Sequence, residues 1–180
     1  MKKYELTSET KVFLGKTLYR IKALVQFGNV NAGDLGGWIE KEENLSQSGN
    51  AWVYGNAWVY GNAEVSGDAR VSDDARVYGN AWVSGDARVY GNARVSGNAE
   101  VCKIGAVFWI GAIGSRNRTT TFFRCKDGKI YVSCGCFLGD LEEFSDKVKQ
   151  THGDNEHGRV YMLAIEMAKA RIVEEKNEVH

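Results

Sequence analysis

A six-residue unit that repeats nine times between Gly49 and Cys102 constrains this chain more than any other feature. Each unit follows the pattern Gly-Asn/Asp-Ala-x-Val-x, with Asp73 once in place of glycine. Six residues of α-helix end about 120° away from the starting stripe, so the valines could not share one helical face. One continuous strand is also excluded, because strands usually span about three to ten residues and Gly-Asn or Gly-Asp turn signals recur along the run. The chain must therefore coil.

Each unit predicts one short strand followed by one corner. The valine of x-Val-x points inward and its two neighbours point outward, while the alanine leaves room where the chain bends. Asparagine, aspartate and glycine tolerate the left-handed backbone conformation that sharp corners need. Such a period is typical of a β-helix, in which a coil buries its apolar side only by stacking on the next coil.

The repeat resembles that of the hexapeptide-repeat superfamily, whose fold is a left-handed parallel β-helix with three hexads in each triangular coil. The resemblance rests on an aliphatic residue followed four positions later by a small one, as at Val53 and Ala57. Glycine stands two positions after the aliphatic residue here, rather than directly after it. We therefore predict a mainly β protein with a left-handed parallel β-helix over residues 49–113, since the valine column continues through Val107 and Ile113.

Residues 1–48 are predicted to form an N-terminal β cap. The alternation of apolar and polar residues over Thr17–Phe27 predicts a half-buried strand. Ile39 and Leu45 are already in phase with the alanine column, and Leu35 lies 18 residues before Val53. We therefore expect the coil to begin before the regular repeats.

Residues 114–180 are predicted to form a C-terminal α+β module, a hairpin followed by two helices. Asp127-Gly128 is a type I′ hairpin signal between two strand-like runs. Asp140 can cap a short first helix that Gly153 closes, and a second helix with a wide apolar stripe runs from about Asn155 to Glu175.

Two segments resemble parts of uncharacterised phage and prophage proteins, some of them described as transferases by similarity. Residues 19–57 are similar to the opening of such repeat proteins, and residues 135–172 are similar to a C-terminal module found on varied phage proteins. The resemblance implies a viral or prophage origin, and hence the bacterial host cytoplasm as location. The first twelve residues lack an apolar signal core, no stretch approaches about 18 apolar residues, and four reduced cysteines fit that location. The 23 basic and 23 acidic residues balance, which argues against bulk binding of nucleic acid.

The outward positions of the repeat are where we expect function. With three hexads per coil, residues 18 apart stack about 4.8 Å from each other on one face. The first face then presents Trp52, Arg70 and Arg88 with Tyr54, Ser72 and Tyr90, and the second presents Trp58, Arg76 and Arg94 with Tyr60, Tyr78 and Ser96. The third face carries Glu64, Trp82 and Glu100 with Ser66, Ser84 and Cys102.

Stacked arginines repel one another, and an anion or an acidic partner surface would relieve that repulsion. Arginine offers a fork of donors to phosphate or carboxylate, and neighbouring tyrosine and tryptophan rings can stack on a planar group. The candidate ligand-binding residues are Arg70, Arg88, Arg76, Arg94, Tyr54, Tyr60, Tyr78, Tyr90, Trp52 and Trp58, with Arg116 and Arg118 of the following loop as a second choice. Two alternatives remain open: solvated ladders, and subunit packing in a cyclic assembly, most often a trimer in the superfamily.

Catalytic signals are weak. Acyltransferases of the resembled superfamily rely on a histidine near a coil edge, and its carbonic anhydrases rely on metal-binding histidines, but the repeats contain no histidine. His152 and His157 are five residues apart and do not share one helical face. Cys134-Gly-Cys136 lacks the two-residue spacer and second pair of a zinc site. We therefore expect no catalytic residue, metal or cofactor.

The resulting hypothesis is an oligomeric phage binding protein that acts by sequestration. It would hold a small anionic, nucleotide-derived ligand, or block a host defence protein, as a counter-defence factor. The alternatives are an acyl-CoA-dependent acyltransferase of the hexapeptide-repeat type and a purely structural trimeric scaffold. Neither a membrane nor nucleic acid is an expected partner.

Overall fold

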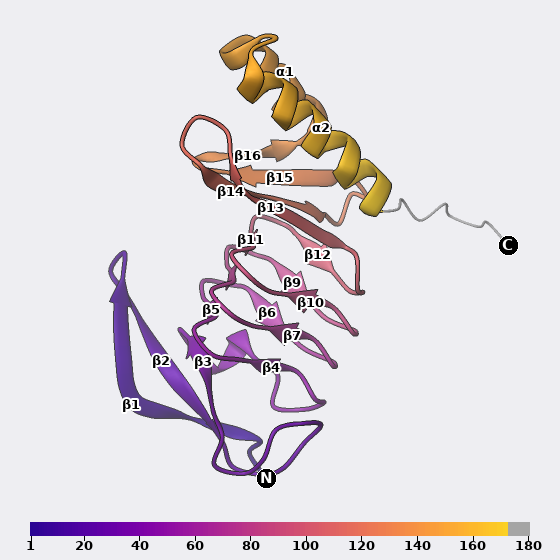
Figure 1. Ribbon diagram of the computed structural model, residues 1–180. Helices are drawn as coiled ribbons and strands as arrows, with labels where there is room; N and C mark the ends of the chain where they lie inside the picture. Colours follow the sequence, from indigo (N-terminus) through magenta and orange to yellow (C-terminus); the bar gives the residue numbers. More distant parts are fainter. Residues whose placement is uncertain (173–180) are drawn as a thin grey trace, which may run out of the picture.

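The computed structural model describes residues 1–172, which run from an N-terminal hairpin through a stack of coils to a sheet and two helices (Figure 1). Each hexad contributes one two-residue strand to the stack. These strands are β4 (Trp52–Val53), β5 (Trp58–Val59), β6 (Glu64–Val65), β7 (Arg70–Val71), β8 (Arg76–Val77), β9 (Trp82–Val83), β10 (Arg88–Val89), β11 (Arg94–Val95) and β12 (Glu100–Val101). The predicted β-solenoid is confirmed.

The nine short strands form three parallel ladders, one on each face. Their orders are β4-β7-β10, β5-β8-β11 and β6-β9-β12. The register places Arg70 between Trp52 and Arg88, and Arg76 between Trp58 and Arg94, so residues 18 apart stack as predicted. Every valine and alanine of the two columns between Ala51 and Val101 is at most 1% exposed, so the stack encloses one continuous apolar core.

One corner of the solenoid lacks glycine. Asp73 has a φ of 59°, in the left-handed region that the corresponding glycines of other coils adopt. Its Oδ2 accepts a hydrogen bond of 2.8 Å from the Gly91 backbone N–H, one coil further along. Aspartate tolerates this backbone conformation better than most residues, and the bond to the next coil fixes the corner.

The first coil begins before the repeats, as predicted, but in a different register. Strand β3 (Leu35–Ile39) pairs in parallel with β5, so that Ile39 faces Val59, and Leu45 bridges to Val65. Both residues therefore join the valine column, not the alanine column. The reason is a longer corner. Leu45 and Val53, which are neighbours in the column, are eight positions apart, whereas the valines of successive hexads are six positions apart. Leu35 is 53% exposed and does not continue the column beneath Val53.

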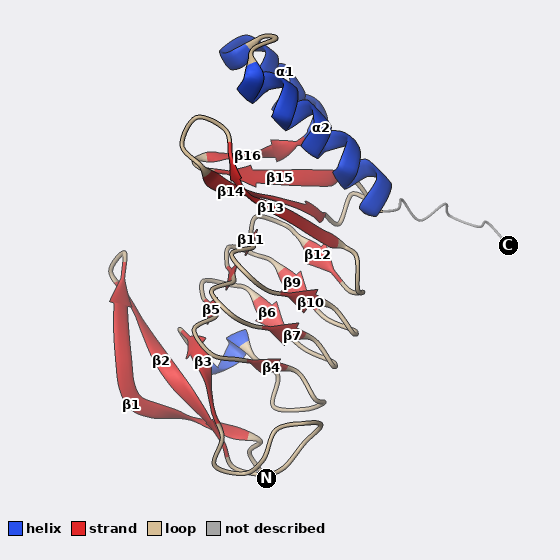
Figure 2. Ribbon diagram, viewed as in Figure 1, coloured by secondary structure: helices blue, strands red, loops and turns tan. Residues whose placement is uncertain are grey.

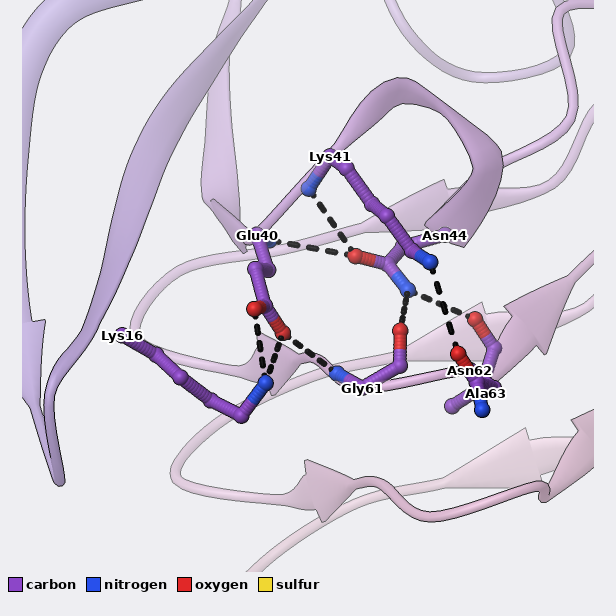
Figure 3. Close-up of polar contacts among 7 residues, drawn as sticks. All are labelled: Lys16, Glu40, Lys41, Asn44, Gly61, Asn62 and Ala63. Carbon is purple, nitrogen blue, oxygen red and sulfur yellow. Dashed lines mark hydrogen bonds and ion pairs between the residues drawn. The ribbon is translucent and has the colours of Figure 1, made fainter.

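A short 3₁₀ helix, η1 (Glu42–Asn44), turns this first coil, and buried polar contacts hold it to the second coil (Figure 3). The Asn44 amide donates to the carbonyls of Gly61 at 3.1 Å and Ala63 at 2.8 Å, while its oxygen accepts from the Glu40 and Lys41 N–H groups. The Glu40 carboxylate accepts from Lys16 Nζ at 2.7 and 2.9 Å and from the Gly61 N–H at 2.6 Å. Asn44 is fully buried with its side-chain donor and acceptor used.

The N-terminal hairpin consists of β1 (Tyr4–Phe13) and β2 (Lys16–Ala23), and it extends the second-face ladder to the order β1-β2-β3-β5-β8-β11. Figure 1 shows the hairpin lying along the side of the solenoid. The strand predicted over Thr17–Phe27 ends early, at Ala23, because the chain then turns through a bridge between Phe27 and Val30. The pattern of residues 4–13 had not predicted β1.

An antiparallel sheet closes the other end of the solenoid and carries the helices on its far side (Figure 2). Its strands are β13 (Val107–Ile113), β14 (Arg118–Arg124), β15 (Ile130–Cys134) and β16 (Phe137–Asp140). Val107 and Ile113 therefore do not extend the valine column, which stops at Val101, because β13 pairs antiparallel with β14. Phe123 packs into the solenoid core and Phe122 into the helical core, so the sheet is apolar on both sides.

The hairpin between β14 and β15 forms, but its turn is not type I′. Gly128 has a φ of 80°, whereas Asp127 is not in the left-handed region, and the Gly128 N–H donates to the Cys125 carbonyl at 2.9 Å. A type I′ turn needs positive φ at both central residues, so this turn belongs to the longer class with one left-handed glycine.

Helix α1 (Leu141–His152) begins and ends as predicted, and helix α2 (Glu156–Arg171) begins directly after Asn155, where its start was predicted. The Asp140 side chain accepts the N–H groups of Glu142 and Glu143, and Gly153 ends the helix with a φ of 53°, both as predicted. The predicted continuation of the second helix to Glu175 lies outside the described residues. Across residues 1–172, no helix has the length and apolar character required to cross a membrane.

Candidate functional site

A concave surface of about 570 Å³ lies on the first face of the solenoid, over β7 and β10. It is bounded by an N-terminal loop at one end and by the start of the C-terminal module at the other. The residues around it are Asn29, Tyr54, Arg70, Ser72, Asp73, Arg88, Tyr90, Ile104, Gly105, Val107 and Arg171. We call this surface the first-face pocket. It brings together four of the predicted ligand-binding residues, namely Tyr54, Arg70, Arg88 and Tyr90.

Arg70 and Arg88 occupy adjacent coils in direct register. Within residues 1–172 neither guanidinium takes part in a hydrogen bond or an ion pair. Asp73 also borders the pocket, but one of its carboxylate oxygens already accepts the Gly91 N–H. Among residues 1–172, the surface therefore offers two stacked guanidinium groups without a hydrogen-bond or ion-pair partner, which a ligand could engage.

Two tyrosines flank these arginines. Tyr54 is half-buried and packs against the solenoid core, whereas Tyr90 is 52% exposed. The Tyr90 ring meets Trp109 edge-on, with centroids 6.2 Å apart and an interplanar angle of 82°. Because about half of the Tyr90 surface is exposed, part of its ring is accessible to a planar group.

Arg171 contributes a third cation from the end of α2, and the sequence did not predict it. Gly105 borders the pocket with a φ of 93°, and a Cβ atom there would lie 3.2 Å from Arg171 Nη1. A side chain at this position would strain the backbone and crowd the guanidinium. No local pattern could have revealed Arg171, because its role depends on where α2 docks on the sheet.

Trp52, also predicted on this face, does not reach the pocket. It is 1% exposed, with the Phe27 ring centroid 5.3 Å away and the Tyr4 ring centroid 6.0 Å away. The N-terminal cap therefore covers this tryptophan, which becomes part of the core.

The second face uses its predicted residues differently. The Arg76 guanidinium lies 4.3 Å from the Trp58 ring centroid and 5.1 Å from that of Phe13 at the hairpin tip. Tyr60 and Tyr78 stack with centroids 5.1 Å apart and nearly parallel planes, and burial raises the pKa of Tyr60. Arg94 remains exposed. The contact between Arg76 and Phe13 holds the hairpin against the solenoid, whereas the tyrosine stack joins two coils.

The remaining predicted site residues, Arg116 and Arg118, line a separate pocket in the C-terminal module, together with Cys134, Cys136 and His152. Burial raises the pKa of Tyr161, which also lines that pocket and lies 3.6 Å from Cys134 Sγ. Over residues 1–172, no three side chains of the His, Cys, Asp and Glu types are grouped so as to hold a metal ion.

Comparison with known proteins supports the solenoid. A family model described as the YdcK beta solenoid repeat matches residues 69–85 and 87–102. The chain is also 39% identical over 62 residues to the uncharacterized acetyltransferase YdcK of Escherichia coli (strain K12). That similarity covers 30% of this chain and 19% of the relative. Residues 69–85 and 87–102 are thus similar to β-solenoid repeats of the YdcK type, in agreement with the coils that they form in the structure.

Proposed function

We propose that this protein is a β-solenoid binding protein whose first-face pocket holds a small anionic ligand with a planar group, such as a nucleotide-derived molecule. The observation that carries the proposal is the pair formed by Arg70 and Arg88. They stack in register, have no hydrogen bond or ion pair within residues 1–172, and border a pocket large enough for a small molecule.

The energetics favour an anion between the two arginines. Two positive charges about 5 Å apart repel by about 1 kcal/mol in water and by several kcal/mol at an effective dielectric constant of about 20. A phosphate would replace this repulsion with charge-assisted hydrogen bonds, each typically worth about 1.5 to 3 kcal/mol. Stacking on Tyr90 would add about 0.5 to 1.5 kcal/mol for a planar group.

A thermal-shift screen against cyclic nucleotides, ADP-ribose derivatives and acetyl-CoA, followed by calorimetry on the best compound, tests the proposal. Arg88→Ala should weaken binding by about ten- to a hundredfold without lowering the melting temperature, because the valine and alanine columns beneath it stay intact. Arg94→Ala, the equivalent substitution on the second face, is the matched control and should bind like the wild type. Unchanged affinity in an Arg70→Ala/Arg88→Ala variant would contradict the proposal, as would a screen without any shift.

Acyl transfer is the second candidate, and the similarity to a protein named as an acetyltransferase is the observation that favours it. The two functions differ in the fate of the ligand. Sequestration returns the bound compound unchanged, whereas an acyltransferase would move the acetyl group of acetyl-CoA to an acceptor hydroxyl or amine and release free CoA. Mass spectrometry after incubation of the compound with stoichiometric protein and a small-molecule cell extract, which supplies the acceptor, separates them.

The proposal also includes an assembly. The third face exposes the Glu64 side chain, and Glu100 stacks beyond Trp82 on the same ladder, so an acidic face could meet a cationic face of another copy in a closed trimer. Glu64→Lys with Glu100→Lys should then dissociate the oligomer, and sedimentation of the wild type as a monomer at micromolar concentration would remove the assembly. In a phage setting, such an oligomer would counteract host defence by sequestering a nucleotide-derived signal or by blocking a host protein.

A further inference from the structure

A second concave surface, of about 310 Å³, lies within the C-terminal module and shares no lining residue with the first-face pocket. It forms where the β13–β14 turn and the β15–β16 turn approach α1 and α2. We call it the module pocket. Its residues come from strands β13 to β16, from two of the turns between them and from both helices, which the fold brings together around one hollow.

Aromatic rings form the floor of the module pocket. Phe144 and Tyr161 are buried and meet edge-on, with ring centroids 5.5 Å apart. The ring of Phe137 lies 5.2 Å from Phe144, and that of His152 lies 5.7 Å from Tyr161. Edge-on and tilted rings of this kind give the pocket an apolar floor that an aromatic ligand can contact.

The rim is cationic. Arg116, Arg118 and Lys147 line the pocket, and none of the described residues that line it is an aspartate or a glutamate. In the part of the chain that the structure describes, the guanidinium groups of Arg116 and Arg118 form no hydrogen bond or ion pair, and Lys147 Nζ donates to Gln150 at 3.3 Å. Within residues 1–172, nothing therefore competes with an anionic group for these guanidinium donors.

The loop that carries the two arginines is held in place by close packing. Gly114 has a φ of 72°, and a Cβ atom there would overlap the Tyr161 hydroxyl. Only glycine lets the loop approach this closely, so the backbone just before Arg116 rests on the aromatic floor. Tyr161 Oη in turn lies 3.6 Å from Cys134 Sγ, which also accepts a hydrogen bond of 3.2 Å from Thr120 Oγ1. The rim and the floor are thus positioned together before any ligand arrives.

We infer that the module pocket binds a small organic anion, with one aromatic ring on the floor and a phosphate or carboxylate group at Arg116 and Arg118. The pocket volume lies at the lower end of the range for small-molecule sites, which favours a single ring. A ligand should bind tightly only if it has both an aromatic ring for the floor and an anionic group for the rim. This site is independent of the first-face pocket and of the function proposed for it.

Cys136 gives the site its own reporter. It is an exposed free thiol lining the module pocket, whereas Cys102, the other exposed free thiol, lies on the third face of the solenoid. Alkylation by iodoacetamide, followed residue by residue with mass spectrometry, should slow at Cys136 but not at Cys102 when phenyl phosphate is present. Phenol and inorganic phosphate, which supply only the ring or only the anion, should protect Cys136 at distinctly higher concentrations.

Two variants connect the protection to the rim. Arg116→Ala with Arg118→Ala should raise the phenyl phosphate concentration needed for half-protection at least about tenfold. Arg88→Ala, in the first-face pocket, should leave that concentration unchanged, so failure of one site is distinguishable from failure of the other. Equal alkylation of Cys136 with and without phenyl phosphate up to its solubility limit would overturn the inference. Undiminished protection in the double arginine variant would overturn it as well.

Discussion

The first and second faces of the solenoid are built from nearly the same hexads, but their outward residues make different contacts. Each stacks a tryptophan and two arginines at intervals of 18 residues. On the second face, Phe13 of the hairpin packs against Trp58, and Arg76 lies over both rings. On the first face, the cap covers only Trp52 and leaves the two arginines facing a pocket. The repeat thus determines which residues stack, while the flanking segments determine which of them remain available.

The largest expected effect comes from a substitution in the core, which should unfold the solenoid and so abolish both faces. Val77 is fully buried in the middle coil and pairs with Val59 and Val95. Val77→Asp would bury a charge without a partner, and should prevent folding or leave the protein aggregated. Circular dichroism and gel filtration check this outcome. Ser72→Asp, at a half-buried outward position, is the control and should fold, and a Val77→Asp protein with a wild-type melting temperature would contradict the inward register.

The next effect should separate the two faces. Phe13→Ala removes the ring that packs against Trp58 and Arg76, and should lower the free energy of unfolding by about 1 to 2 kcal/mol because the ring is only half-buried. Ligand affinity at the first-face pocket should not change. Thermal melting and calorimetry measure the two quantities. Val12→Ala and Leu14→Ala alter the exposed neighbours at the hairpin tip and should leave the melting temperature unchanged.

A smaller effect should appear only on the first face. Arg171→Ala removes the cation that α2 adds beside Gly105, and should weaken ligand binding about tenfold, because one charge-assisted contact is lost at an exposed position. Calorimetry with the compound found by the thermal-shift screen measures the change. Lys169→Ala, two residues earlier in α2 and outside the pocket, is the matched control. A wild-type affinity for Arg171→Ala would restrict the site to the solenoid itself.

The smallest effect concerns the first coil of the second-face ladder and depends on pH. Burial opposes ionisation of Glu40, but hydrogen bonds from Lys16 and the Gly61 N–H outweigh it and lower the pKa of this carboxyl below its usual 4.5. A carboxylate with a lowered pKa in the folded state stabilises the protein above the unfolded-state pKa, and this stabilisation disappears as pH falls through the folded-state value. Glu40→Gln should therefore cost about 0.5 to 1 kcal/mol at neutral pH, with the difference shrinking below pH 4.5.

Melting temperatures of wild type and variant, compared at neutral and acidic pH, check that expectation. Glu5→Gln, an exposed substitution in β1, should give the wild-type melting temperature at neutral pH. A constant difference between wild type and Glu40→Gln across the pH range would show that the ion pair seen in Figure 3 does not contribute.

The valine and alanine columns predicted the coils residue by residue, because stacked coils of a solenoid need the same residue types at the same interval. The features that the pattern did not predict lie in the segments where the regular repeat ends. The corner between Leu45 and Val53 has two extra residues, so the first coil changes phase without any warning from the hexads. Strand β1 contains a register irregularity between Leu6 and Thr10, which hides the alternation that would have marked it.

The candidate sites were predicted only in part, for a related reason. Arg70 and Arg88 were predictable because their stacking follows from the period alone. Their pocket was not, since Ile104 and Arg171 reach it only through the way the closing sheet and α2 pack. Trp52 shows the converse case, an outward position that the cap converts into core.

Strand β14 joins two cores through the two sides of one backbone. Phe123 completes the solenoid interior and Phe122, its neighbour in sequence, completes the interior beneath the helices. Strand β14 therefore belongs to both cores, and removing either core would expose one side of this strand to solvent. Deleting the helices would leave Phe122 facing solvent, and shortening the solenoid would leave Phe123 without contacts. Chemical denaturation should accordingly report one cooperative transition for both compartments, and a different module could be joined to this solenoid only through a strand whose alternate residues suit both sides.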